Sequence, residues 1–135
     1  MTYLLDVNAL VALGLLQHEF HSRLIAWLRG PASKQSAVLA TCSITELGFV
    51  RILAQASQYG FTVSQARDLL LRLKVEQPFP FTFIVDDHDA SSLPAWVKTS
   101  KQVTDGHLAQ LARTNGAVFA TLDRKIPGSF LIPES

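Results

Sequence analysis

Short apolar runs alternate with longer segments of helical periodicity along the whole chain, and this order restricts the possible folds more than any other feature. The apolar runs are Tyr3 to Val7, Ala37 to Thr41, Phe81 to Val85, Ala117 to Leu122 and, near the end, Phe130 to Ile132. Strands that alternate with helices form a parallel sheet that is covered on both faces. We therefore expect an α/β protein of three layers, α/β/α, around a central parallel sheet of four to five strands.

The chain is expected to form one domain over residues 1–135, because it shows no repeat, linker or change in composition. Its residues are 48% hydrophobic and 17% charged, which is enough apolar surface for a core. The single cysteine, Cys42, has no partner for an internal disulfide, so a reducing cytoplasm is the expected location. No apolar run is long enough to span a bilayer, so no membrane association is expected.

Local signals predict where several helices begin. Ser43 to Glu46 has the pattern of a capping box, in which Glu46 would bond the Ser43 backbone amide. Thr62 or Ser64 is expected to begin the next helix. Thr104 is expected to cap a later helix that ends at Asn115-Gly116.

Four acidic residues stand at the junctions between these elements. Asp6 and Asp123 end predicted strands, while Glu46 and Asp105 lie in the first turns of predicted helices. In a parallel α/β sheet, strand carboxyl ends and the amino ends of the following helices share one edge. We therefore expect all four carboxylates to converge there.

Such a cluster needs compensation for its charge. Two carboxylates about 5 Å apart repel by roughly 3 kcal/mol at an effective dielectric of ~20. Oxygen ligands favour hard ions, so Mg²⁺ or Mn²⁺ is expected, and such an ion suits hydrolysis of a phosphodiester. Each acid also has a purely structural interpretation. Asp6 could cap a helix, and Glu46 could be the second member of the capping box. Asp105 could interact favourably with the helix dipole, and Asp123 could stabilise a turn.

The motifs around the four acids resemble those of the PIN-domain ribonucleases, in particular VapC-type toxins of bacterial toxin–antitoxin pairs. They are Leu4 to Leu10, Thr45 to Arg51, Val103 to Ala109 and Ala120 to Arg124, in the order and spacing of that family. The resemblance covers essentially the full length of the chain. It implies a PIN-like, Rossmann-like fold and an endoribonuclease in which Asp6, Glu46, Asp105 and Asp123 hold Mg²⁺ or Mn²⁺.

The resemblance also implies supporting residues and partners. Asn8 matches a polar position whose side chain supports the first acid, and Thr121 matches a hydroxyl position before the last acid. A homodimer and a cognate VapB-like antitoxin are implied, with RNA as the substrate and growth or translation as the process inhibited. Gly106 departs from the alanine that is commoner at its position, and glycine weakens a helix.

Two other functions are considered. A phosphatase of the haloacid dehalogenase class needs an aspartate two positions after the first, where this chain has Asn8. A PIN-like module that binds without catalysis would not need all four acids. The net charge of +1 decides nothing about a nucleic-acid partner, although Lys98, Lys101, Arg113, Arg124 and Lys125 gather in the C-terminal part.

Several other polar and aromatic residues are expected to be structural. Asp86 to Asp89 is interpreted as a solvated loop, His107 as a surface residue of its helix, and Arg51 as part of a surface ion pair or a phosphate contact. Trp27 and Trp96 are expected to make core or dimer contacts.

Overall fold

A computed structural model describes residues 1–134 and shows five strands in one sheet. The strands are β1 (Thr2–Leu5), β2 (Val38–Thr41), β3 (Phe81–Phe83), β4 (Val118–Thr121) and β5 (Phe130–Leu131). Their order is β3-β2-β1-β4-β5, and every neighbouring pair is parallel. Leu4 lies opposite Ala40 on one side and Phe119 on the other. The prediction of a parallel sheet of four to five strands is confirmed.

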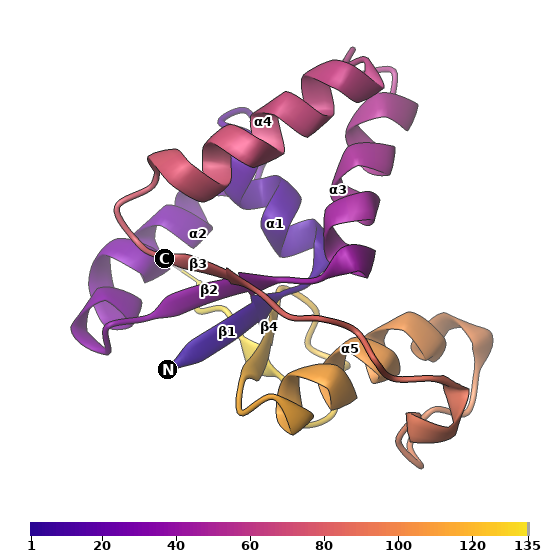
Figure 1. Cartoon of the computed structure of the whole chain (residues 1–135). Helices are drawn as coiled ribbons and strands as arrows, with labels where there is room; N and C mark the ends of the chain where they lie inside the picture. The colour runs from indigo at the N-terminus through magenta and orange to yellow at the C-terminus, as the bar shows by residue number, and fades with distance from the viewer. Residues whose placement is uncertain (135) are drawn as a thin grey trace.

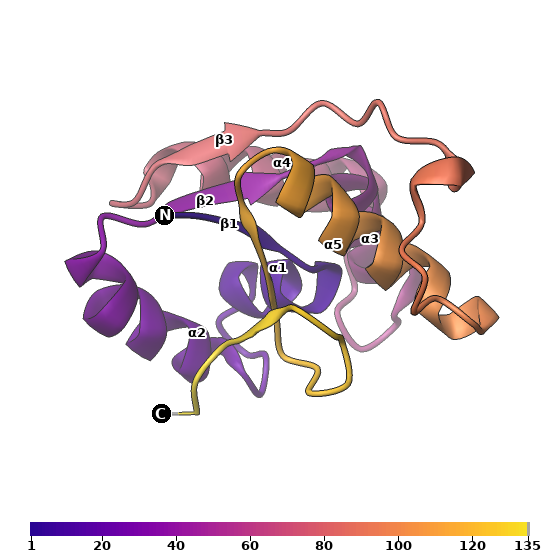
Figure 2. The same cartoon turned by 90° about the horizontal axis from the view of Figure 1, so that it is seen from below.

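Helices cover both faces of this sheet. The α-helices are α1 (Val7–Gly14), α2 (His21–Trp27), α3 (Ser43–Gln55), α4 (Val63–Glu76) and α5 (Val103–Thr114). A π-helical turn, η1 (Leu28–Ala32), follows α2, and two 3-10 turns, η2 (Ala90–Ser92) and η3 (Ser100–Gln102), precede α5. The first four helices lie on one side of the sheet and α5 on the other (Figures 1 and 2). No helix within residues 1–134 is long and apolar enough to cross a membrane.

Two clusters of buried side chains fill the two layers. Leu5, Leu39 and Phe49 belong to the cluster under α1 to α4. Leu4 and Leu108 belong to the cluster under α5. Consecutive residues of a strand point to opposite faces, so Leu4 and Leu5 fill different layers, and both are fully buried. This explains why the central strands β1, β2 and β4 are mainly apolar and do not alternate with polar residues, whereas the edge strand β3 exposes Thr82 and Phe83.

Three helix starts test the predicted caps. Thr62 caps α4, which confirms one of the two predicted starts of this helix. The Thr62 hydroxyl accepts the Gln65 N–H, and the Gln65 side chain accepts the Thr62 N–H. The predicted capping box of Ser43 and Glu46 is wrong, because α3 is capped at Cys42, whose N–H donates to the Thr45 hydroxyl at 2.9 Å. Glu46 is thereby released from a capping role.

The predicted cap at Thr104 is also wrong. Thr99 begins the preceding turn η3, and α5 continues directly from it, with Gln102 before the first residue of the helix. Thr104 therefore lies inside the first turn. Asp105 remains in that first turn, as the sequence predicted.

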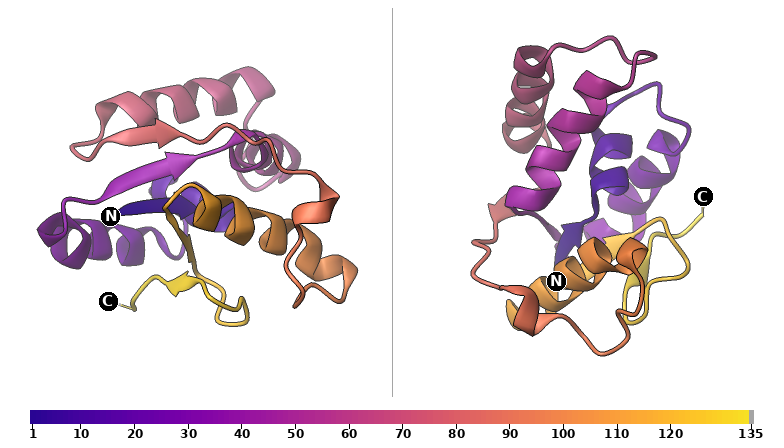
Figure 3. Two further views of the ribbon diagram at one scale, coloured as in Figure 1. Left: turned by 60° about the horizontal axis from the view of Figure 1, so that its bottom comes forward. Right: turned by 90° about the vertical axis from the view of Figure 1, so that its right-hand side faces the viewer.

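The direction of the strand order changes at β1. The chain adds β2 and then β3 on one side of β1, and afterwards places β4 on its other side. In open parallel sheets, ligands bind outside the strand carboxyl ends at such a switch point. The residues that follow β1 and β4 are therefore the first place to look for a site, and these strands lie beside each other in Figure 3.

Candidate active site

Asp6 is held rigidly at the end of β1. Its backbone N–H donates to the Ala120 carbonyl of β4 at 3.0 Å, which extends the parallel pairing by one residue. Its carboxylate caps α1 by accepting the Ala9 N–H at 2.7 Å, and it also accepts the Thr121 hydroxyl. The residue is only 7% exposed. The predicted capping role is therefore real, and it orients a buried carboxylate at the switch point.

Asp105 and Asp123 approach the same carboxylate from α5 and from the turn after β4. Thr121 connects Asp6 with this turn, because its oxygen also accepts the Asp123 N–H at 3.0 Å. The Asp123 carboxylate in turn accepts the Lys125 N–H at 2.9 Å. Asp105 is half-buried and Asp123 is exposed.

The three aspartates influence one another electrostatically. Burial raises the pKa of Asp6 to about 6, the bonds from Thr121 and Ala9 lower it, and the charges of Asp105 and Asp123 raise it further. Burial and the charge of Asp123 likewise raise the pKa of Asp105. These three carboxyl groups are therefore close enough to repel one another, and no basic side chain is among the groups that shift Asp6.

Glu46 belongs to a different set of contacts. Its Oε2 accepts the Thr41 hydroxyl at 2.5 Å and pairs with Lys74 Nζ of α4 at 2.6 Å. The Lys74 and Glu46 side chains are 22% and 21% exposed. The ammonium also lies 5.6 Å from the centroid of the Phe83 ring. Glu46 is thus at the same sheet edge as the aspartates but is neutralised by a lysine of its own layer.

The arrangement brings three of the four predicted acids together and holds the fourth apart. Within residues 1–134, no group of three or more His, Cys, Asp or Glu side chains has an arrangement that could hold a metal ion. The donor set nevertheless has the right chemistry for a hard cation, because it consists of carboxylate oxygens with a deficit of positive charge around Asp6.

The two predicted supporting residues are placed differently. Thr121 is fully buried and hydrogen-bonded to Asp6. Asn8 is exposed in the first turn of α1, and its side chain makes no hydrogen bond within the described part of the chain. The hydrogen bonds to the Asp6 carboxylate come from Thr121 and the Ala9 amide, and a supporting role of Asn8 stays a prediction.

Sequence reasoning missed two polar contacts near the site. The first is Lys74, which antiparallel packing of α3 against α4 brings to Glu46; the register of two consecutive helices was the available signal. The second joins Asp86 to His107 of α5, with Oδ2 and Nε2 2.5 Å apart. Burial raises the pKa of Asp86, but the hydrogen bonds from His107 and the His88 amide, together with the charges of both histidines, lower it by more, so the net shift is downward. Asp86 and His107 therefore hydrogen-bond to each other and link the segment after β3 to α5. The interpretation of Asp86 as part of a solvated loop and of His107 as a surface residue is corrected for these two side chains.

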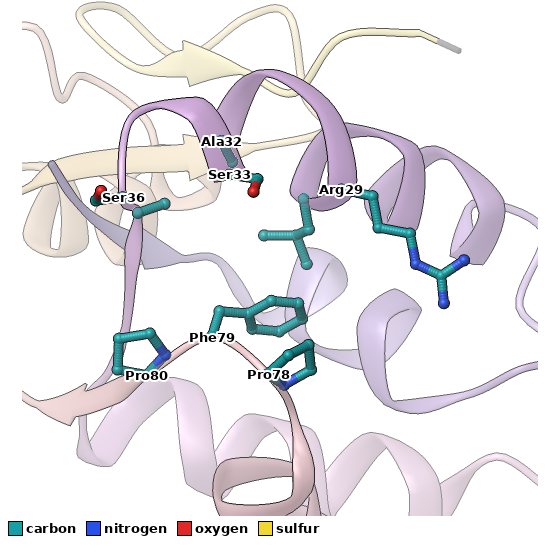
Figure 4. A pocket seen from close by; sticks show the side chains of 9 residues that line it. Arg29, Ala32, Ser33, Ser36, Pro78, Phe79 and Pro80 are labelled. Carbon is teal, nitrogen blue, oxygen red and sulfur yellow. The ribbon is translucent and has the colours of Figure 1, made fainter.

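Several hollows lie outside the acidic cluster, and two of them differ in their position on the sheet. One, of ≈ 380 Å³, is lined at the amino ends of β2 and β3 by the segments around Ala32 and Phe79. Figure 4 shows Phe79 facing Ala32 and Ser33 across it. It is on the sheet edge opposite the acids. The other, of ≈ 750 Å³, lies beside α5.

Known proteins with similar sequences carry one family name. Ribonuclease VapC29 of Mycobacterium tuberculosis is 35% identical over 127 residues, which cover 91% of this chain and 86% of that protein. Ribonuclease VapC44 of the same organism is 36% identical over 133 residues, covering 93% and 89%. No family model matches the chain.

Solved structures with the same fold agree with these relatives. The VapBC2 complex of Rickettsia felis, bound to a DNA fragment from its promoter, matches with a TM-score of 0.63 at 16% identity and covers 97% of both chains. VapC20 of M. tuberculosis, a toxin that cleaves the sarcin-ricin loop, matches with a TM-score of 0.63 at 12% identity and covers 98% of this chain and 99% of its own. At these identities the two structures establish the fold.

Proposed function

Since this chain belongs to the VapC family of PIN-domain ribonucleases, we propose that it hydrolyses RNA phosphodiesters with Mg²⁺ or Mn²⁺ held by Asp6, Glu46, Asp105 and Asp123. Nucleases of this family depend on a divalent metal ion. The choice of ion and the four ligand residues are our proposal. The observation that carries it is the buried Asp6 carboxylate at the switch point, with two further aspartates close enough to raise its pKa.

A cation fits this place for an electrostatic reason. Carboxylates that raise one another's pKa lose that repulsion when a divalent ion lies among them, and oxygen donors suit Mg²⁺ and Mn²⁺. A cation of this kind lowers the pKa of water and offsets charge on a phosphoryl oxygen. Asp105 is half-buried and Asp123 exposed, so both side chains retain freedom to adjust around an ion.

The remaining residues orient the acids. Thr121 and the Ala9 amide each bind one oxygen of Asp6, which fixes the plane of its carboxylate. Thr41 does the same for one oxygen of Glu46. Lys74 supplies a positive charge at Glu46, so an ion that takes Glu46 as a ligand competes with this ammonium.

The proposal is tested with Asp6→Asn, which keeps the shape of the side chain and removes its charge. The wild type should cleave RNA with Mn²⁺ and not with EDTA, and Asp6→Asn should lose at least about 100-fold in rate, the scale of a lost contact to the reacting charge. Asp68→Asn, an exposed residue of α4, is the matched control. Calorimetry should show Mn²⁺ binding to the wild type and the control but not to Asp6→Asn.

Three results would contradict the proposal. Cleavage that is equal with Mn²⁺ and with EDTA would exclude the metal site. A wild type that binds RNA but never cleaves it would favour the module that binds without catalysis. A phosphorylated aspartate intermediate would favour a phosphatase instead.

The same family membership supports a partner. Because the VapBC2 structure contains a VapB together with its VapC, we propose that a VapB-type antitoxin binds and silences this chain, and that the chain forms a homodimer. Co-expression with a small antitoxin-like protein encoded next to it should yield a stable complex without nuclease activity. Light scattering of the isolated chain tests the dimer.

A further inference from the structure

The larger hollow is a groove of ≈ 750 Å³ beside α5. Its lining includes Pro94, Trp96, Gln110, Arg113, Phe119 and Gly128. These residues come from the segment before α5, from α5 itself, from β4 and from the turn after β4. Figure 3 shows the first and the last of these segments beside α5.

The groove is built onto the elements that carry two of the acids. Ala109 and Arg113 line it, and they follow Asp105 at intervals of four residues, so the three lie along one face of α5. Eight residues of helix span about 12 Å. The opposite wall includes Pro127 and Gly128, in the turn that begins at Asp123. The groove therefore adjoins the helix and the turn that carry Asp105 and Asp123, while neither acid is itself among its lining residues.

Close packing fixes the wall that carries Trp96. A Cβ atom on Gly106, the residue after Asp105, would lie 2.2 Å from Val97 Cγ2 and 3.5 Å from Pro94 Cδ. The segment of residues 94–97 thus rests directly on the first turn of α5. Trp96 is only half-buried, whereas Trp27 is a core residue at 2% exposure.

The groove combines the groups that recognise a nucleotide. Trp96 offers an aromatic surface between the apolar walls of Pro94 and Phe119, and bases stack on such surfaces. The Gln110 amide can both donate to and accept from a base edge. Arg113 is exposed and makes no ion pair within residues 1–134, so its guanidinium is available to a phosphate.

The charges beside the groove favour RNA over a second copy of the chain. Lys98 and Lys125 each stand two residues in sequence from a lining residue, Trp96 and Pro127, and, like Arg113, are exposed without an ion pair in the described part of the chain. An interface between identical copies would bring these like charges together. A polyanion would neutralise them and release counterions.

We propose that this groove is a subsite for single-stranded RNA, in which a base stacks on Trp96 and the phosphate beside it pairs with Arg113. The inference rests on the proposed function, since it concerns the RNA that the acidic cluster would cleave. It assigns Trp96 a contact with substrate in addition to its packing against the buried cluster under α5, which agrees with the core contact expected from the sequence.

The test measures the binding of a fluorescently labelled single-stranded RNA by anisotropy, with the full chain in EDTA so that no cleavage occurs. Trp96→Leu should weaken binding roughly tenfold, and Trp96→Phe, which keeps an aromatic ring, by less than about threefold. Arg113→Gln should weaken binding and lower the slope of log affinity against log salt by about one. Arg67→Gln, an exposed arginine of α4, is the matched control and should change neither.

Separate outcomes distinguish the groove from the proposed function. If the wild type cleaves RNA with Mn²⁺ but Trp96→Leu and Arg113→Gln both bind RNA like the wild type, the subsite is excluded and the nuclease stands. If those variants instead change the oligomeric state with unaltered RNA affinity, the groove is an interface between copies and the inference fails. Circular dichroism melts of Trp96→Phe and Arg113→Gln establish that a loss of binding is not a loss of folding.

Discussion

The Asp6 carboxyl is the only carboxyl group among the buried residues of the described chain, and its pKa predicts how stability depends on pH. The ordinary pKa of 3.8 applies to the unfolded chain, and about 6 applies to the folded one. Between these values the folded state binds the proton more tightly, so the free energy of unfolding should fall as pH rises from about 4 to about 6. The loss should be on the order of 3 kcal/mol for metal-free protein.

Urea unfolding in EDTA across this pH range measures the effect. Asp6→Asn should flatten the profile and be more stable than the wild type at pH 7, since the buried charge is gone. Asp68→Asn should keep the wild-type profile. Asp105 has the same direction of shift and adds a smaller slope of the same sign. Stability that rises with pH through this window would show that Asp6 is not desolvated as the structure indicates.

The contact of Lys74 with Glu46 leads to a second prediction, which concerns the affinity for Mn²⁺. The lysine ammonium pairs with Glu46 at 2.6 Å, so it opposes any cation that uses Glu46. Replacing it in Lys74→Met should tighten Mn²⁺ binding roughly fivefold, the equivalent of about 1 kcal/mol from one neighbouring charge. Titration calorimetry compares it with Lys34→Met, an exposed lysine before β2. Weaker Mn²⁺ binding in Lys74→Met would mean that Lys74 assists the site.

At the scale of elements, the sequence predicted the kinds and order of secondary structure well. Apolar runs and helical spacing located every strand and α3, α4 and α5, because local hydrophobic periodicity reflects the layers that a segment contacts. The errors lie where a cap depends on tertiary context. Cys42 and Gln102 precede α3 and α5 because the chain enters these helices from a strand and from a 3-10 turn.

For the candidate site, the sequence predicted which acids share one sheet edge but not the side-chain contacts around them. Strand ends and helix starts placed Asp6, Asp105 and Asp123 at one edge, since topology alone decides this. The Asp86 contact to His107 depends on how distant segments pack, which no local pattern encodes, whereas the Lys74 contact to Glu46 depends on the register between two consecutive helices. The exposed position of Asn8 likewise follows from the rotation of α1 about its axis.

The close packing around Gly106 predicts how a substitution in α5 changes the free energy of unfolding. Alanine normally stabilises a helix by about 1 kcal/mol over glycine, but here its Cβ would lie 2.2 Å from Val97 Cγ2. Overpacking of this kind costs about 1–3 kcal/mol, so Gly106→Ala should lower the free energy of unfolding. The double variant Gly106→Ala with Val97→Ala removes the clashing methyl and should recover part of the loss. A gain in stability from Gly106→Ala alone would contradict the packing of residues 94–97 on α5.

For the whole molecule, the acids come from β1, α3, α5 and the turn after β4, so a cation would join both layers of helices through the sheet edge. A ligand that binds only the folded state stabilises it by about 2.7 kcal/mol at a hundred times its dissociation constant. For a chain of this size we expect Mn²⁺ to raise the Tm by roughly 10 °C under that condition. Differential scanning calorimetry at pH 7.5, with and without Mn²⁺, measures the shift.

The same experiment with two variants separates site binding from unspecific effects of the ion. Asp6→Asn should abolish the shift, whereas Asp68→Asn on the exposed face of α4 should retain it in full. Because Asp6→Asn and Asp68→Asn each remove one carboxylate, a shift that survives in Asp6→Asn would place the bound Mn²⁺ elsewhere on the molecule. An unchanged Tm in the wild type at saturating Mn²⁺ would show that the three aspartates and Glu46 do not form one site.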